Sequence, residues 1–272
     1  GHLQQSDDEF ILAPGERGLV MICFTLPSFD VVFKLIRDRF PYQKNILRED
    51  VLTKYELVFK HDRAGRLVDA QEFKLIKFPR SRFSAELLEE LQKEAARTVH
   101  FEGDDLIIDH VYIERRMTPL NLYLRSASRE DAEKAVIEYG QAIRDLAVTN
   151  IFPGDLLLKN FGVTRHGRVI FYDYDELCLV TDCRFREIPQ SQHDEDDMRA
   201  DAWFYVGESD VFPETFINFL GFDPQLKQVF LDAHAEVLTA EWWRGIQERL
   251  REGELLEVLP YHRHRVRVFS SL

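Results

Sequence analysis

The pattern of apolar residues changes near Pro119, and this change constrains the fold more than any other feature of the sequence. Before it, short runs rich in β-branched and aromatic residues predict strands at residues 10–13, 18–26, 29–36, 72–78 and 104–116. After it, residues 128–150 carry apolar side chains at helical spacing behind a serine cap, which predicts one long helix. We therefore expect an α+β chain with a sheet-rich N-lobe, residues 1–118, and a mainly helical C-lobe, residues 119–272.

Two helices and a glycine-containing turn are expected within the first lobe. Residues 48–60 and 84–98 both place apolar side chains on one helical face. A Pro-Gly turn with a second glycine at Gly18 joins the first two strand runs. The first lobe is thus predicted to begin with a hairpin whose tip is flexible.

Composition limits the kinds of partner and compartment. The chain has 35 basic and 48 acidic residues, and its formal charge of -13 disfavours general attraction to nucleic acid or to an anionic membrane. No apolar run approaches the roughly 20 residues that cross a bilayer. Three cysteines, Cys23, Cys178 and Cys183, are too few and too unevenly spaced for a disulfide framework. These features favour a reducing, cytoplasmic location.

The segment 152–176 contains an acid, an amide and another acid at informative separations. Asp155 and Asn160 precede or begin a predicted hairpin with strands 160–163 and 169–174, and Asp173 closes it. Because a hairpin places its flanking ends side by side, we expect the three side chains to converge on one pocket. Four residues separate Asp155 from Asn160, and twelve separate Asn160 from Asp173. This is also the spacing of the catalytic loop and the metal-binding aspartate in protein kinases.

Phosphoryl transfer needs these groups because the reaction depends on positioning and on charge neutralisation. Asp155 would accept a proton from the attacking hydroxyl, or orient it. Asp173 and the amide oxygen of Asn160 would hold Mg²⁺, which prefers hard oxygen ligands. The spacing therefore predicts a site for a metal and a nucleotide.

The first lobe offers matching contacts for ATP. The glycine-containing hairpin tip can cover phosphates with backbone N–H groups, and Lys34 on the next strand can reach the α- and β-phosphates. Residues 114–117 stand where a kinase carries its hinge, so Glu114 and Met117 are expected to offer backbone groups to adenine. The glutamate that pairs with Lys34 is left open between Glu49 and Glu56.

Several long segments together resemble the bacterial isocitrate dehydrogenase kinase/phosphatase family. They are APGERGLVM, FTLPSFDVVFK, YIERRMTPLNLYL, NIFPGDLLLKNFGVTRHGRVIFYDYDE and DVFPETF, and the similarity runs through nearly the whole chain. The resemblance implies a bilobal protein-kinase-like fold. It also implies a bifunctional enzyme that phosphorylates a serine of isocitrate dehydrogenase and removes that phosphate, controlling flux between the citric acid cycle and the glyoxylate bypass.

The same resemblance implies parts that this sequence lacks. Family members carry an N-terminal regulatory domain before the kinase-like domain, and this chain resembles only the second part. It begins without an initiator methionine, which agrees with a missing N-terminal domain. Control by an effector such as AMP is implied by the family alone, at the place where its two domains meet.

The resemblance further assigns roles to individual residues. The loop that it assigns to ATP consists of Ala13, Pro14, Gly15, Glu16, Arg17, Gly18 and Leu19. Lys34 matches the ATP-contacting lysine, and Asp155, Asn160 and Asp173 match the catalytic and metal-binding groups.

Two more acids receive a role from the resemblance. Asp175 matches an acid tied to the phosphatase reaction, for which ADP or water would accept the phosphate. We expect Asp175 to share a strand and a face with Asp173, because the two are two residues apart. Asp69 matches an active-site aspartate, although the residue pattern alone gives it no clear role beyond a turn acid.

Two other functions fit the same residues. A small-molecule phosphotransferase on a bilobal fold would share the spacing and would hold its substrate with acidic side chains of the C-lobe. A nucleotide-binding fragment that is inactive without its regulatory domain is the second alternative. The leading prediction is an ATP-dependent protein-serine kinase with a coupled phosphatase activity.

Overall fold

The computed structural model describes residues 6–15, 17–41, 46–61, 65–189 and 204–254. The chain divides into two compact units, which are described separately here. Unit 1 comprises residues 1–60 and 68–118, and unit 2 comprises residues 61–67 and 119–272. The short segment 61–67 therefore belongs to unit 2 although the chain before and after it belongs to unit 1.

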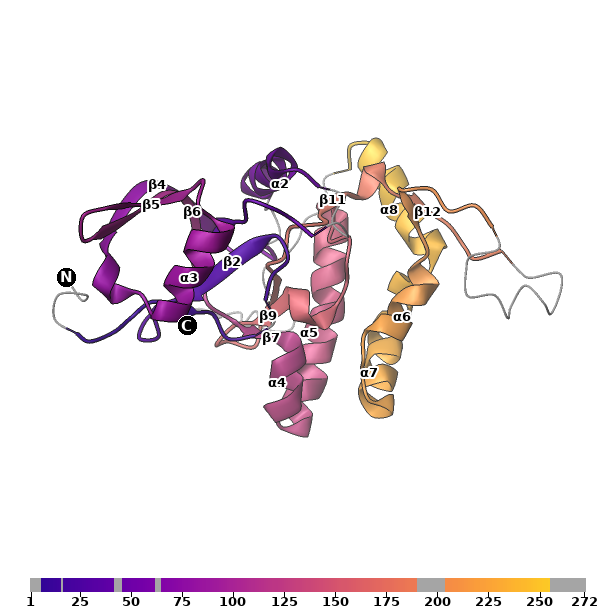
Figure 1. Ribbon diagram of the computed structural model, residues 1–272. Helices are drawn as coiled ribbons and strands as arrows, with labels where there is room; N and C mark the ends of the chain where they lie inside the picture. The colour runs from indigo at the N-terminus through magenta and orange to yellow at the C-terminus, as the bar shows by residue number, and fades with distance from the viewer. Residues whose placement is uncertain (1–5, 16, 42–45, 62–64, 190–203, 255–272) are drawn as a thin grey trace, which may run out of the picture. The chain divides into compact units, whose positions relative to one another are not determined.

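Unit 1 is built on an antiparallel sheet with the strand order β1-β2-β3-β6-β4, and β5 also pairs with β6 (Figure 1). The strands are β1 (Ile11–Leu12), β2 (Met21–Thr25), β3 (Val31–Ile36), β4 (Ala70–Pro79), β5 (Val99–Glu102) and β6 (Asp105–Arg115). Every strand expected in the first lobe is present. The sequence did not predict β5, which turns back into β6 at Gly103, where φ is +59°.

The helices of unit 1 lie on opposite faces of the sheet. α3 (Ala85–Glu94) begins after Ser84, whose hydroxyl accepts the backbone N–H of Leu87. It packs on the face that carries a phenylalanine-rich core of Phe10, Phe24, Phe33 and Phe83. The helix is shorter than predicted, because the residues after it turn toward β5. A single 3-10 turn, η1 (Arg80–Arg82), precedes it.

The other helix, α2 (Arg48–His61), lies on the opposite face. Its Tyr55 ring stacks on that of Tyr112 from β6, with 3.8 Å between ring centroids. Successive side chains of a strand point to opposite faces, so Lys34 faces α2 while its neighbours Phe33 and Leu35 enter the phenylalanine-rich core. The helix predicted at residues 48–60 is confirmed.

Unit 2 is mainly helical, and its longest helix is the predicted one. Its helices are α4 (Leu120–Ser126), α5 (Arg129–Val148), α6 (Phe216–Phe219), α7 (Pro224–His234) and α8 (Ala240–Arg251). Ser128 caps α5 by accepting the N–H of Asp131, and the chain turns at Asn150, where φ is +65°. The expected apolar stripe of α5 is buried throughout: Ala132, Val136, Tyr139, Ile143 and Leu146.

Short strand pairs complete unit 2 (Figure 1). β8 (Ile151–Phe152) pairs antiparallel with β11 (Cys178–Leu179), β9 (Phe161–Val163) with β10 (Val169–Phe171), and β12 (Arg184–Phe185) runs parallel to β13 (Asp210–Val211). The 3-10 turns of unit 2 are η2 (Leu158–Asn160), η3 (Val180–Asp182), η4 (Pro213–Thr215) and η5 (Ala235–Leu238). The two-residue strand β7 (Thr118–Pro119) lies where the sequence passes from unit 1 to unit 2.

Candidate active site

The loop predicted to bind ATP lies between β1 and β2 and has no regular structure where it is described. Gly15 has φ of +124° and open space where a side chain would begin. A Cβ on Gly18 would lie 2.8 Å from the carbonyl oxygen of Met21. Arg37 donates from Nε to the Gly18 carbonyl at 3.0 Å, which fixes the end of the loop. Glu16 lies outside the described residues.

Arg17, another member of this loop, is engaged by α3. Its Nη2 lies 2.9 Å from Glu86 Oε1, and its Nη1 lies 3.7 Å from Glu90 Oε2. Ala13 is held by a backbone bond from its N–H to the Cys23 carbonyl at 2.9 Å, whereas Leu19 is exposed. Both ends of the loop are thus anchored, and its middle, at Gly15, is the open part.

Lys34 is a buried cation with a buried partner. Its side chain is 8% exposed, and Nζ lies 2.7 Å from Oε2 of Glu114, which is 2% exposed. The hydroxyl of Tyr55 donates to the other Glu114 oxygen at 3.3 Å. A buried ammonium needs such a carboxylate, because desolvation of either charge alone is costly. The sequence left the partner of Lys34 open between Glu49 and Glu56. Glu114 is neither of these, so the structure alone reveals this pairing.

The register of the sheet explains the pairing. Lys34 is directly opposite Tyr112, and Val32 is directly opposite Glu114, so Lys34 and Glu114 are diagonal neighbours on one face. Glu114 is also opposite Ala70 of β4, which places it inside the sheet with a strand on each side. Its carboxylate therefore orients Lys34. Met117, the other expected adenine contact, follows β6 and is half-buried.

Asp69, to which the resemblance gives an active-site role, also belongs to unit 1. It directly precedes β4, and its side chain is exposed.

In unit 2, two strand pairs bring distant parts of the sequence together. β8 leads into residues 153–160, and its partner β11 follows residues 172–177. β9 and β10 join the other ends of these same two segments. The backbone bond from the Tyr172 N–H to the Asn160 carbonyl, 3.1 Å long, ties the segments directly. The predicted hairpin is thus present, and Asp155 and Asp173 lie on segments joined at both ends.

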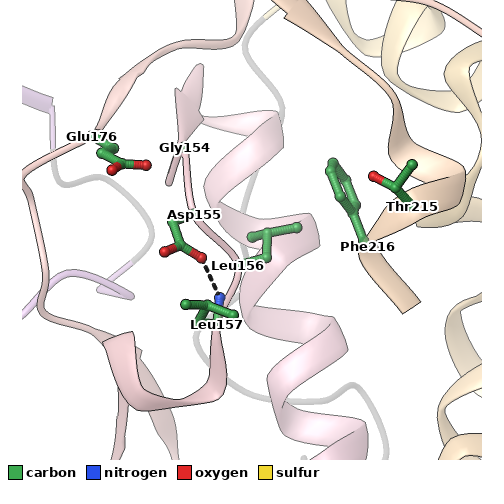
Figure 2. Close-up of a pocket in the computed structure, with 7 residues that line it drawn as sticks. All are labelled: Gly154, Asp155, Leu156, Leu157, Glu176, Thr215 and Phe216. Carbon is green, nitrogen blue, oxygen red and sulfur yellow. Dashed lines mark hydrogen bonds between the residues drawn. The ribbon is translucent and has the colours of Figure 1, made fainter. Parts of the chain in front are cut away.

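Asp155 lies in a fixed local structure at this meeting point. Its Oδ1 accepts the backbone N–H of Leu157 at 2.9 Å, as the dashed line in Figure 2 marks. Tyr139, from α5, donates its hydroxyl to the next carbonyl, that of Leu156. Gly154 allows the close approach of the second segment, because a Cβ there would lie 2.3 Å from the Glu176 carbonyl oxygen.

Negative charge accumulates around Asp155. Burial raises the pKa of its carboxyl above the ordinary value, and the nearby charges of Glu176 and Asp173 raise it further. The Leu157 N–H and the Asn160 side chain oppose this rise. A concentration of carboxylates of this kind suits both proton transfer and a divalent cation.

The residues predicted to hold Mg²⁺ fit that role in their donor chemistry. Asn160 is 5% exposed, and its Nδ2 donates to the Asp155 carbonyl at 3.4 Å, a contact that does not use the amide oxygen. Asp173 is half-buried on the adjoining segment. Within the described residues, no three His, Cys, Asp or Glu side chains are grouped to hold a metal ion. One carboxylate and one amide suit Mg²⁺ where phosphates and water supply the remaining ligands.

The expectation for Asp175 is wrong in its structural basis. Strand β10 ends at Phe171, so Asp173 and Asp175 do not share a strand. Between them, Tyr174 is buried at 2% exposure and packs against Phe171, and the Leu177 N–H bonds to the Tyr174 carbonyl in a turn. The chain thus leaves the hairpin before Asp173, which the alternating pattern of the sequence did not reveal.

A pocket opens beside Asp155, but Asn160 and Asp173, which were expected to converge on one pocket with it, are not among the residues that line this pocket. Figure 2 shows Asp155 and Glu176 on one side of it and Phe216 with Thr215 on the other. Gly154, Leu156 and Leu157 complete the lining. Glu176 stands beside the predicted acids in the sequence, but Phe216 comes from a distant segment, and no local pattern links it to Asp155.

No helix in the described part of the chain is both long enough and apolar enough to span a lipid bilayer.

Comparison with known proteins gives the family. Residues 8–263 match the family model described as the isocitrate dehydrogenase kinase/phosphatase (AceK) kinase domain. The chain belongs to this family. Among curated relatives, the isocitrate dehydrogenase kinase/phosphatase of Anaeromyxobacter sp. (strain Fw109-5) is 54% identical over 260 residues, covering 96% of this chain and 45% of the relative.

Two further relatives of the same name agree with this kinase-domain membership. The protein of Methylibium petroleiphilum is 50% identical over 264 residues, which are 97% of this chain and 43% of the relative. The protein of Pectobacterium carotovorum is 49% identical over 264 residues, with 97% and 45% covered. The chain thus spans less than half the length of the curated relatives it matches.

Proposed function

We propose that this chain is the catalytic part of an enzyme that transfers the γ-phosphoryl group of ATP to a serine of isocitrate dehydrogenase and also removes it. In this proposal the fold is protein-kinase-like, with residues 1–118 as N-lobe and residues 119–272 as C-lobe. Family membership supports the proposal, since the relatives are named for both activities on this substrate. The observation that carries the chemistry is the joining of the Asp155 segment to the Asp173 segment by two strand pairs.

Each residue group has a task in the kinase direction. Lys34, oriented by Glu114 at 2.7 Å, would bind the α- and β-phosphates with a charge-assisted contact. The loop 13–19 would cover the phosphates, with Gly15 allowing their close approach. Asp155 would accept the proton of the serine hydroxyl as its oxygen attacks the γ-phosphorus, and ADP would leave.

Asn160 and Asp173 would hold Mg²⁺ through one amide and one carboxylate oxygen. When bound, the ion supplies positive charge that neutralises the phosphate oxygens. Asp69 and Asp175 are proposed for the phosphatase direction, in which the phosphoryl group leaves the serine for ADP or water.

The test replaces Asp155 with Asn in the full-length natural protein. Since the amide cannot accept the serine proton, phosphorylation of purified isocitrate dehydrogenase should fall by about 10²- to 10⁴-fold. Binding of Mg²⁺ and ADP, measured by calorimetry, should change by less than a few-fold. A variant that loses nucleotide binding as well would make Asp155 a metal or folding residue instead.

The same preparations discriminate between protein and small-molecule substrates. Wild-type protein is assayed with radiolabelled ATP against isocitrate dehydrogenase, and against aminoglycosides and choline. The proposal predicts label on isocitrate dehydrogenase. Label on a small molecule with none on isocitrate dehydrogenase would favour the small-molecule phosphotransferase.

A further inference from the structure

Arg66 is a buried charged residue for which the proposed reaction has no use so far. It lies in the segment that follows α2 and belongs to unit 2, and it is 4% exposed. Arginine is almost never buried to this degree unless it is paired. Its partners therefore indicate what its burial achieves.

The guanidinium group of Arg66 joins α5 to β10. Its Nε donates to Asp145 Oδ2 at 2.6 Å, and its Nη1 donates to Glu138 Oε2 at 2.8 Å. The same Nη1 donates to the backbone carbonyl of Val169, the first residue of β10, at 3.0 Å. Gln141 donates to the other Asp145 oxygen at 2.6 Å, which fixes that carboxylate in turn.

The backbone of the same segment supports the far end of β10. The Phe171 N–H donates to the Arg66 carbonyl at 2.8 Å, and Leu67 forms a parallel bridge with Phe171. On its other edge, β10 pairs with β9 through its three residues. The three-residue strand is thus held on both edges, and Asp173 follows its last residue by two positions.

We propose that Arg66 is a positioning residue for the metal-binding segment Tyr172–Asp173. This inference rests on the proposed function, because it assumes that Asp173 binds Mg²⁺. Mg²⁺ demands near-ideal octahedral geometry, so a ligand displaced by a fraction of an ångström binds it poorly. A three-residue strand followed by three residues without regular structure supplies little rigidity of its own, and the Arg66 anchor supplies it by fixing both ends of β10.

The chemistry explains why the residue is an arginine. Its fork donates at fixed angles to two carboxylates and a carbonyl, whereas a lysine ammonium is a single point on a flexible stem. Arg66→Lys should therefore keep the charge balance but lose the geometry. Arg66→Met removes both.

The first experiment measures metal binding rather than turnover. Mn²⁺ replaces Mg²⁺ as a paramagnetic probe, and its binding together with ADP to the full-length protein is followed by electron paramagnetic resonance. Loss of a partner that bonds directly to a metal ligand usually weakens a metal site by about 10- to 100-fold. Arg66 acts one step further away, through β10, so Arg66→Met should weaken Mn²⁺ binding by about tenfold, the lower end of this range. Arg66→Lys should fall between Arg66→Met and the wild type. The binding of ADP without metal should change less than twofold in both.

The matched control is Arg144→Met. Arg144 lies on the same helix, α5, and pairs with Glu236 away from β10. The Arg144→Met substitution should lower the melting temperature with no change in Mn²⁺ binding. If Arg66→Met lowers stability in the same way and leaves Mn²⁺ binding unchanged, Arg66 is a packing residue and the inference is overturned.

A second experiment keeps the inference separate from the proposed function. Hydrogen exchange of the protein without ligands should speed up at the Phe171 amide and the residues just after it in Arg66→Lys, but not in α8. Glu138→Gln, which removes the charge of one partner but keeps an oxygen that can accept from Arg66, should show a smaller local effect. If wild-type protein fails to bind Mn²⁺ with ADP, the proposed function is wrong. The hydrogen-exchange result still tests whether Arg66 holds β10 in place. Unchanged exchange at Phe171 contradicts the anchor itself.

Discussion

At the scale of single residues, the proposed function depends on a small set of polar side chains, and some of them could be chosen from the sequence. Asp155, Asn160 and Asp173 could be chosen from the sequence because their separations fit one loop and one hairpin, which are local structures. The Glu114 partner of Lys34 could not, because it depends on the register between β3 and β6, strands far apart in the sequence. Phe216 could not be found for the same reason. Local spacing is readable from a sequence, but long-range register is not.

Replacing Lys34 with Met tests the nucleotide contact in unit 1. The change removes a charge-assisted contact to phosphate, worth roughly 1.5 to 3 kcal/mol, so ADP affinity should fall by roughly 10- to 100-fold. Calorimetric titration with ADP measures it. Lys77→Met is the matched control, since Lys77 is exposed on β4 and pairs with Asp105 at the surface. Equal affinities in the two variants would make Lys34 a structural partner of Glu114 only.

The two acids after β10 test whether the activities can be separated. Asp173→Ala should abolish both activities, since it removes a proposed metal ligand. Asp175→Ala should lose far more phosphatase than kinase activity, because the water or ADP that accepts the phosphate has to be oriented only in the phosphatase direction. Both rates are measured on the same full-length preparations. A parallel fall of the two rates in Asp175→Ala, or no fall in either, is the result that removes this division of labour.

At the scale of elements, the helices were predictable where caps and periodicity agreed. α5 has a serine cap, acids in its first turn and a regular apolar stripe, and it begins and ends close to the predicted residues. The sequence did not predict β5, because residues 99–102 come immediately after a helical pattern of apolar residues. They form a strand by pairing with β6. β10 ends at Phe171, before the predicted residue 174, and the chain turns between Tyr174 and Leu177. Tertiary contacts determined these outcomes, and a local pattern does not contain them.

The contact between α5 and α7 gives a test of packing. A Cβ on Gly140 of α5 would lie 2.1 Å from the His234 ring of α7. Gly140→Ala should therefore destabilise the protein by about 1 to 3 kcal/mol, despite the better helix propensity of alanine. Gly245→Ala in α8 is the matched control, because open space surrounds that position. It should be neutral or stabilise by up to about 1 kcal/mol. Urea unfolding measures both, and equal effects would contradict the packing argument.

His234 also gives this contact a pH dependence. Its Nε2 donates to the Ile137 carbonyl at 2.9 Å, and its buried Nδ1 has no hydrogen-bond partner among the described residues. Burial lowers the pKa of His234 below its ordinary value, and Arg144 adds to this, while the Ile137 carbonyl, Glu236 and Asp145 oppose it. The unfolded chain then binds the proton more readily, so the contribution is present above about pH 6.5 and is lost as pH falls.

The comparison of wild type with His234→Leu isolates this effect. The free energy of unfolding of the wild type should decrease more steeply between pH 7.5 and 5.5 than that of the variant. Identical slopes would mean that His234 does not titrate differently in the folded and unfolded states.

At the scale of the whole molecule, the residues that receive a role in the proposed function belong to two compact units. Unit 1 offers Lys34 and the loop 13–19, and unit 2 offers Asp155, Asn160 and Asp173. The chain spans less than half of its relatives, so assays of activity belong in the full-length protein. The α+β class and the family could be recognised from the sequence, because long motifs carry them. The Arg66 anchor could not, because it depends on a short segment returning to a distant helix.

The most direct test of the central claim is a crystal structure of the full-length protein with Mg²⁺ and ADP. One Mg²⁺ should be bound by both the Asn160 amide oxygen and an Asp173 carboxylate oxygen, each about 2.1 Å from the ion, with phosphate oxygens completing the site. Asp155 should face this cluster without binding the ion. A structure with nucleotide bound in which Asn160 and Asp173 point apart and share no metal would contradict the account.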